Sequence, residues 1–136
     1  DHAPHTYEEK NNEYVNCPSG GPLVQHSLVA VLEGYHNNKI KLEKIVQKMC
    51  HNPAILYEIE KRGFIKEGYY ADIVIFNLNN PWTVNKGNIL YKCGWSPFEG
   101  NTFRSRISYT IVNGNIVYNN DKIFDNKLGK KLIFNR

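Results

Sequence analysis

The sequence predicts an α+β protein in which three helices precede a small, mostly antiparallel β unit. Apolar residues recur at helical spacing up to about Gly63, and beyond it the chain contains short β-branched and aromatic runs typical of strands. The dipeptide Asn113-Gly114 separates two of these runs, which indicates a hairpin. With 136 residues, the chain is expected to form one compact domain.

Each of the first two helices is predicted from one apolar stripe. In the first, over residues 22–37, the stripe is made of Val24, Leu28, Val31, Leu32 and Tyr35. In the second, it is made of Leu42, Ile45, Val46, Met49 and Cys50. Pro22 suits a first helical turn, because its missing N–H has no partner to lose there. Asn52 and Pro53 predict the start of a third, separate helix that ends at Gly63.

Four strands are predicted after Gly63. Residues 72–76 form an apolar run expected to be a buried strand. Residues 107–111 and 116–118 are expected to pair across a turn at Asn113-Gly114, whose two residues both accept positive φ. Residues 131–134 are expected to form a last short strand.

Composition excludes several classes of function. The chain has 17 Lys and Arg against 13 Asp and Glu, a net charge of +4 that is spread along the sequence. Lys39, Lys41, Lys44 and Lys48 alternate with apolar residues, which indicates a solvated helix face rather than a nucleic-acid site. No apolar run is long enough to cross a membrane, and the first residues lack a signal-peptide pattern. The three scattered cysteines favour reduced thiols, and so a cytoplasmic protein.

Residues 1–21 are polar, hold several Pro and Gly residues, and are expected to form a long functional loop. Asp1, His2 and His5 place three metal-ligating or acid–base side chains within five residues. Their spacing alone matches no established metal motif, and most such clusters are surface polar residues. Because this loop lies at the extreme N-terminus, we expect the chain to be part of something longer.

Five motifs, in order, resemble those of dihydroorotases of the longer, bacterial type. They are 1–6 (DHAPHT) with 8–10 (EEK), 18–22 (PSGGP), 52–54 (NPA) with 63–72 (GFIKEGYYAD), 96–100 (SPFEG) and 112–114 (VNG). The resemblance extends to about Tyr118, and an ordered set is far more specific than any one motif. It implies that residues 1–62 are the end of a metal-dependent (β/α)8 barrel, with its last catalytic loop and closing helices. Residues 63–136 would then be the C-terminal part of a small β-sandwich.

The resemblance also implies roles for individual residues. Asp1 corresponds to the aspartate that ligates one of two zinc ions and acts as general base and acid. His5 corresponds to the histidine that binds the carboxylate of dihydroorotate. The backbone around Ser19 and Gly20 would hydrogen-bond the edge of the pyrimidine ring. His2 occupies a variable position of the family and receives no role.

The implied reaction interconverts dihydroorotate and N-carbamoyl-L-aspartate in pyrimidine biosynthesis. The family's other zinc ligands precede the aspartate of this motif, so we expect this chain alone to hold no zinc and to have no hydrolase activity. The parent enzyme would be a homo-oligomer acting on a small molecule, without nucleic-acid or membrane partners.

Two alternatives to dihydroorotase stay open. The parent could be a hydantoinase-like or allantoinase-like cyclic amide hydrolase, although those enzymes usually lack the histidine at the His5 position. It could instead be a non-catalytic, dihydroorotase-like structural subunit.

Side chains outside the motifs are given structural interpretations. His26 is expected to be a partly buried histidine with its hydrogen bonds satisfied, and Cys50 a core residue. Arg104 and Arg106 are expected on the solvent face, and Trp95 among the core or interface aromatics.

Overall fold

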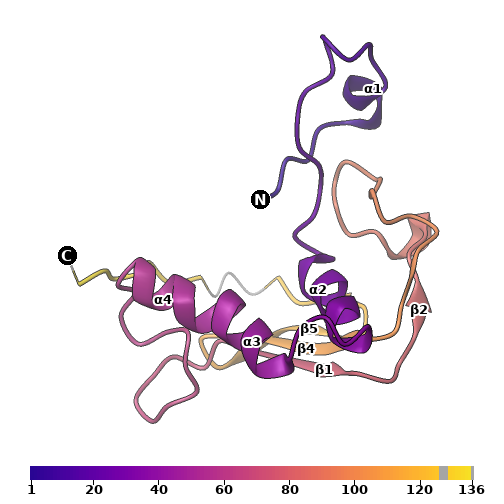
Figure 1. Cartoon of the computed structure of the whole chain (residues 1–136). Helices are drawn as coiled ribbons and strands as arrows, with labels where there is room; N and C mark the ends of the chain where they lie inside the picture. Colours follow the sequence, from indigo (N-terminus) through magenta and orange to yellow (C-terminus); the bar gives the residue numbers. More distant parts are fainter. Residues whose placement is uncertain (126–128, 136) are drawn as a thin grey trace.

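The computed structural model describes residues 1–125 and 129–135, and its α-helices precede its strands as predicted (Figure 1). The helical segments are α1 (Tyr7–Lys10), α2 (Ser27–His36), α3 (Leu42–Val46), the π-helix η1 (Gln47–His51), α4 (Asn52–Leu56) and the 3₁₀-helix η2 (Lys86–Asn88). The strands are β1 (Ile73–Asn77), β2 (Trp82–Thr83), β3 (Thr102–Phe103), β4 (Arg106–Val112), β5 (Asn115–Asn119) and β6 (Lys122–Ile123). Within the described residues, no helix is long and apolar enough to span a membrane.

The strands form two antiparallel sheets. The larger has the order β1-β4-β5-β6, and the smaller pairs β2 with β3. The hairpin between β4 and β5 is confirmed: Asn113 and Gly114 have φ values of 50° and 82°, as a tight turn with two left-handed residues requires.

Two strand predictions need correction. The first strand exists, but it is not buried: Val74 and Ile75 are 41% and 47% exposed, because β1 lies at the edge of its sheet with much of its surface uncovered. The last strand, expected at 131–134, is not formed. Phe134 is in an isolated bridge with Ile59 rather than in a strand, since this segment runs past the turn after α4.

The prediction that the second and third helices are separate is also wrong. Residues 42–56 wind continuously from α3 through η1 into α4, and His51 and Asn52 have helical φ and ψ values. Pro53 has no N–H to donate and would clash with a carbonyl of the preceding α-helical turn. The π segment relieves this conflict: the N–H of Asn52 donates to the carbonyl of Gln47, five residues earlier.

This helix ends earlier than Gly63. Glu58 adopts φ 53°, its N–H donates to Ile55, and the N–H of Ile59 donates to Ala54, which together make a Schellman cap. Gly63 packs against the side of the helix instead. A Cβ added there would lie 2.3 Å from Ala54 Cβ and 2.8 Å from the Cys50 carbonyl oxygen.

The helix predicted over residues 22–37 is confirmed as α2, but it begins at Ser27, not at Pro22. A turn precedes it, in which the His26 N–H donates to Leu23, and the N–H of Gln25 is taken by the Tyr91 hydroxyl at 3.0 Å. Pro22 therefore lies in the buried connection between the N-terminal loop and α2 rather than in a helix.

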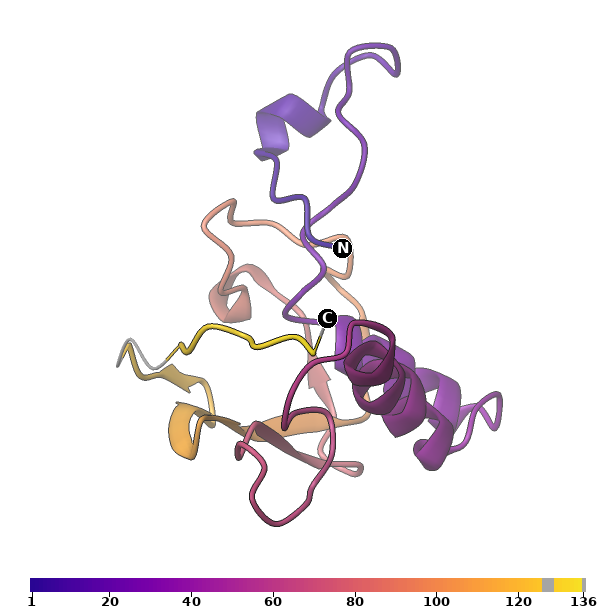
Figure 2. The same cartoon turned by 90° about the vertical axis from the view of Figure 1, so that its left-hand side faces the viewer.

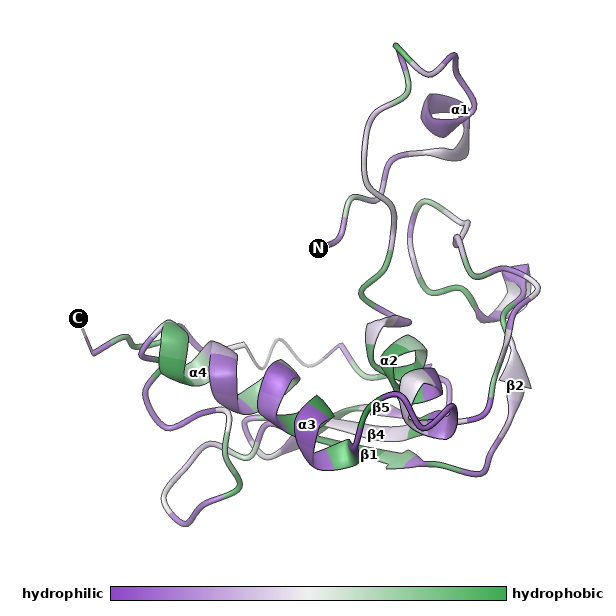
Figure 3. Cartoon of the chain, in the orientation of Figure 1, coloured by the Kyte–Doolittle hydropathy of each residue, from purple (hydrophilic) through white to green (hydrophobic). Residues whose placement is uncertain are grey.

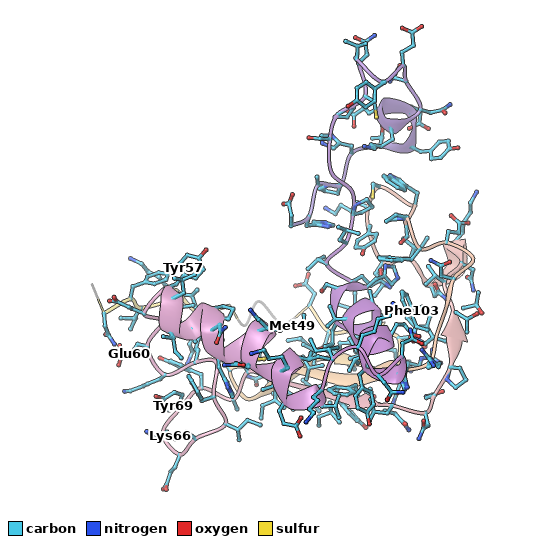
Figure 4. The ribbon with its side chains drawn as sticks, in the orientation of Figure 1. Met49, Tyr57, Glu60, Lys66, Tyr69 and Phe103 are labelled. Atoms are coloured by element: carbon cyan, nitrogen blue, oxygen red, sulfur yellow. The ribbon has the colours of Figure 1, made fainter. Side chains whose placement is uncertain are left out.

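The core lies where α2 meets the residues around β2 and β3. Its buried centre is Val29, Val84 and Phe103, and the apolar character of α2 is plain in Figure 3. Figure 2 shows α2 and the following helix gathered to one side of the strands. Figure 4 places Met49 and Tyr57 on one side of that helix, where they are 38% and 52% exposed.

One structural interpretation changes, and one is confirmed. Cys50 is exposed rather than in the core, because a residue five positions after the buried Ile45 points to another side of the helix. Arg104 is exposed as expected, and its side chain also reaches back to Glu33 and Asn37 on and beside α2.

Candidate functional site

Residues 1–21 form a loop that stands away from the rest of the chain and is closed at its base (Figure 1). The N–H of Ala3 donates to the Gly21 carbonyl at 3.0 Å, which joins the two ends of the loop. Gly20 has φ 82°, and a Cβ added to it would lie 2.7 Å from Ala3 Cβ. Glycine is therefore required at this closure, both for its conformation and for space.

The far part of the loop begins with a well-capped helical turn. Thr6 accepts from the N–H of Glu9, and the Glu9 carboxylate accepts from the N–H of Thr6, so α1 opens with a capping box. The same carboxylate lies 3.7 Å from His5 Nδ1. Lys10 Nζ donates to the Pro18 carbonyl at 2.5 Å and so links the two sides of the loop.

The predicted site residues lie near this closure but do not form a metal-binding cluster. Asp1 is exposed and accepts the N–H of His2 at 2.8 Å, while the His5 side chain is 37% exposed. Ser19 and Gly20 are exposed on the opposite side of the closure, with Gly20 against Ala3. The structure thus brings the Ser19–Gly20 backbone beside the Asp1–His5 segment.

Two aromatic residues from the connection between η2 and β3 support this segment. The Tyr91 ring lies against the ring of His2 with centroids 5.3 Å apart. Trp95 Nε1 donates to the His5 carbonyl oxygen at 2.8 Å. Sequence reasoning gave Trp95 only a core or interface role and singled out Tyr91 for nothing, because no local pattern links positions about ninety residues apart.

Beneath Tyr91 lies His26, which is fully buried, not partly buried as expected. Its Nδ1 lies 3.1 Å from the Tyr91 hydroxyl and 3.2 Å from Ser96 Oγ. Because the Tyr91 oxygen accepts from Gln25 N–H, its own proton is directed to Nδ1. The neutral ring then carries its proton on Nε2, a buried atom without a hydrogen-bond partner.

Burial governs the titration of both residues. It lowers the pKa of His26 below its ordinary value of 6.5, because the charged imidazolium would lose its hydration. Burial likewise raises the pKa of Tyr91 above 10.0, against the opposing effect of the backbone N–H groups of Gln25 and His26. Both side chains are therefore neutral near pH 7 and act as a fixed support rather than as acid–base groups.

The side chains that the structure describes do not by themselves fit a two-metal site. Within residues 1–125 and 129–135, no three His, Cys, Asp or Glu side chains gather closely enough to hold a metal ion. A zinc ion in a catalytic site ordinarily takes three protein ligands. What this region offers by itself is one exposed carboxylate, one imidazole with a neighbouring carboxylate, and a glycine-containing backbone segment.

Comparison with known proteins identifies the class to which this fold and loop belong. The sequence matches the amidohydrolase family over residues 16–117, and the chain belongs to that family. Its fold agrees: the chain superposes on the dihydropyrimidinase from Brevibacillus agri NCHU1002 with a TM-score of 0.81 at 24% identity, over 90% of this chain and 28% of that one.

Within the family, the chain is similar to a dihydroorotase. It is 43% identical to the dihydroorotase of Clostridioides difficile (strain 630) over 120 residues, 88% of this chain and 28% of the relative. It is 33% identical to the allantoinase of Desulfitobacterium hafniense (strain Y51), over 97% of this chain and 30% of the relative. The chain thus spans about three tenths of the length of these relatives.

Proposed function

We propose that this chain is part of a dihydroorotase, an enzyme that interconverts dihydroorotate and N-carbamoyl-L-aspartate. The observation that carries the proposal is His5: a half-exposed imidazole in the matching motif, with a carboxylate of Glu9 3.7 Å from one ring nitrogen. An imidazole N–H can donate a hydrogen bond to the carboxylate of a bound substrate. The 43% identity to a dihydroorotase supports the same conclusion.

In this proposal residues 1–62 supply the end of a (β/α)8 barrel, and residues 63–136 the C-terminal part of a small β-sandwich. Asp1 takes the proton of the attacking water when the carbonyl of the ring amide is attacked, and gives that proton to the leaving amide nitrogen. His5 binds the substrate carboxylate, and the Ser19–Gly20 backbone borders the ring. The zinc ions implied for the intact enzyme need ligands beyond these residues, with Asp1 as one ligand.

A second candidate is a hydantoinase-like or allantoinase-like cyclic amide hydrolase. The relation to the Desulfitobacterium hafniense allantoinase and the fold shared with a dihydropyrimidinase favour it. Hydantoin and dihydrouracil present no carboxylate at the corresponding position, so His5 would have no partner in their complexes.

The test is turnover by the intact protein that contains this chain, with dihydroorotate, N-carbamoyl-L-aspartate, hydantoin, allantoin and dihydrouracil as substrates. We expect turnover of the first two, and a His5→Ala variant with kcat/KM for dihydroorotate reduced roughly a hundredfold. A matched His51→Ala variant, which alters a histidine stacked on Phe64 outside the loop, is expected to retain activity. Preferred turnover of hydantoin or allantoin, unchanged by His5→Ala, would establish the second candidate instead.

A further inference from the structure

Trp95 holds the backbone of His5 from a distant part of the chain. Its Nε1 donates to the His5 carbonyl oxygen at 2.8 Å across a separation of ninety residues. The carbonyl belongs to the residue whose imidazole is proposed to bind substrate. An indole donor at this carbonyl therefore fixes the peptide from which that imidazole projects.

The same ring also meets the other side of the loop closure. A Cβ added to Gly21 would lie 3.9 Å from Trp95 Cη2, which is ordinary van der Waals contact. Gly21 in turn accepts the Ala3 N–H, so the Trp95 indole is bonded to one of the two chain segments that meet at the closure and lies near the other. Figure 1 shows that the loop extends beyond this point away from the remaining chain, so contacts at its base determine its direction.

The position of Trp95 is itself well determined. Ser96, the next residue, is buried, and its Oγ contacts His26 Nδ1 at 3.2 Å while it accepts the N–H of Phe98. Four positions before Trp95, Tyr91 is held by Gln25 and His26 and packs on His2. The buried histidine thus anchors the segment that carries the indole.

We propose that Trp95 is a positioning residue for substrate binding, which orients His5 through its backbone carbonyl. This inference rests on the proposed function. It places the effect of Trp95 on binding of the carboxylate-bearing substrate rather than on the proton transfer assigned to Asp1. Asp1 makes its hydrogen bond with His2 and none with Trp95 among the described contacts.

A purely structural role makes a different prediction, and Trp82 provides the matched control. Its Nε1 also donates to a backbone carbonyl, that of Ser105, at 3.0 Å, and both tryptophans are half-buried. Trp82, however, packs against the core around Val29, Val84 and Phe103, and its other described contacts are with His26 and Ser105 rather than with residues 1–21. Replacing either residue with Phe removes one indole donor and keeps an aromatic ring.

The experiment measures KM and kcat for dihydroorotate in the intact protein carrying Trp95→Phe or Trp82→Phe. We expect Trp95→Phe to raise KM roughly tenfold with kcat within about threefold of the unaltered protein, and Trp82→Phe to leave KM within about twofold. Equal changes in the two variants, or a fall in kcat without a change in KM for Trp95→Phe, would overturn the proposal. If Trp95→Phe does not fold, Trp95→Tyr, which keeps a large ring but moves the donor, is measured in the same way.

Hydrogen exchange supplies a readout that does not depend on activity. The Ala3 and His5 amides are hydrogen-bonded within the loop base, so Trp95→Phe should accelerate their exchange while Trp82→Phe should not. Unchanged exchange in Trp95→Phe would contradict the positioning role whatever the substrate. If the unaltered protein fails to turn over dihydroorotate, the proposed function is wrong, and exchange still decides whether Trp95 fixes the loop.

Discussion

Glu33 accepts two hydrogen bonds from Arg104, one from its backbone N–H at 2.7 Å and one from its side-chain Nε at 2.9 Å. The two residues join the exposed side of α2 to the chain just after β3. Arg104 also donates to Asn37 at 2.9 Å. A single arginine thus ties the end of α2 to the strands, a contact that sequence spacing did not indicate.

This pair predicts an acid-sensitive contribution to stability. Partial burial raises the pKa of Glu33, but the hydrogen bonds and charge of Arg104 outweigh it, so the pKa falls below its ordinary value of 4.5. A carboxylate with a depressed pKa stabilises the fold above pH 4.5, and this contribution is lost as pH falls through the lower folded-state pKa. Glu33→Gln should cost about 1 kcal/mol at pH 7 and less near pH 3, as measured by urea unfolding.

The control for that prediction is Glu43→Gln, which replaces an exposed carboxylate on α3. We expect it to change unfolding free energy little at either pH. Equal losses for both variants would show that Glu33 acts through net charge rather than through Arg104.

His26 predicts a response in the same direction, but at higher pH. Burial lowers its pKa, so the unfolded chain binds more protons than the folded one below the ordinary value of 6.5. Stability should therefore be highest above pH 6.5 and decline below it, by at most about 1.4 kcal/mol per pH unit from this residue. A His26→Gln variant should flatten the unfolding free energy between pH 7.5 and 5.5. If its slope matches that of the unaltered protein, His26 is not the titrating group.

Gly63 and Gly68 allow strain and steric overlap to be separated. Both have φ 79°, but only Gly63 has atoms close to a new Cβ, whereas none lies within 4 Å at Gly68. Gly68→Ala should cost about 1 kcal/mol for the left-handed backbone. Gly63→Ala should cost roughly 1–3 kcal/mol more, because Ala54 and the helix backbone must move. Thermal unfolding of both variants tests the difference, and equal melting temperatures would contradict it.

Asp1 provides a prediction for the proposed chemistry. In the intact protein, Asp1→Asn should lower kcat for dihydroorotate by roughly 10²–10⁴, because an amide cannot accept and return the proton. Glu8→Gln, which alters another exposed carboxylate of the same loop, is the control and should keep kcat. A variant at Asp1 that retains kcat would remove this residue from the mechanism.

A prediction from the sequence was correct where the contacts that determine the structure are between residues close in the sequence. The hairpin at Asn113-Gly114 was correct because the two turn residues themselves require positive φ. The prediction of a separate helix starting at Asn52 was wrong. Asn52 and Pro53 are typical of a helix start, but π winding lets the preceding helix continue through them. In the candidate site, the assignment of Asp1 and His5 comes from the motif alone and stays a prediction, whereas the hydrogen bond from Trp95 arises only from tertiary structure.

The π segment has a further consequence for the angular phase of the long helix. Ile45 and Ala54 are both buried although they are nine positions apart. At about 100° per residue, an uninterrupted α-helix would direct them about 180° apart. One π turn absorbs an extra residue, so they are related as residues eight apart, with directions about 80° apart. Deleting one residue from Gln47–His51 would therefore keep both side chains in phase on an α-helix, but it would return Pro53 to the conflict that the π winding relieves.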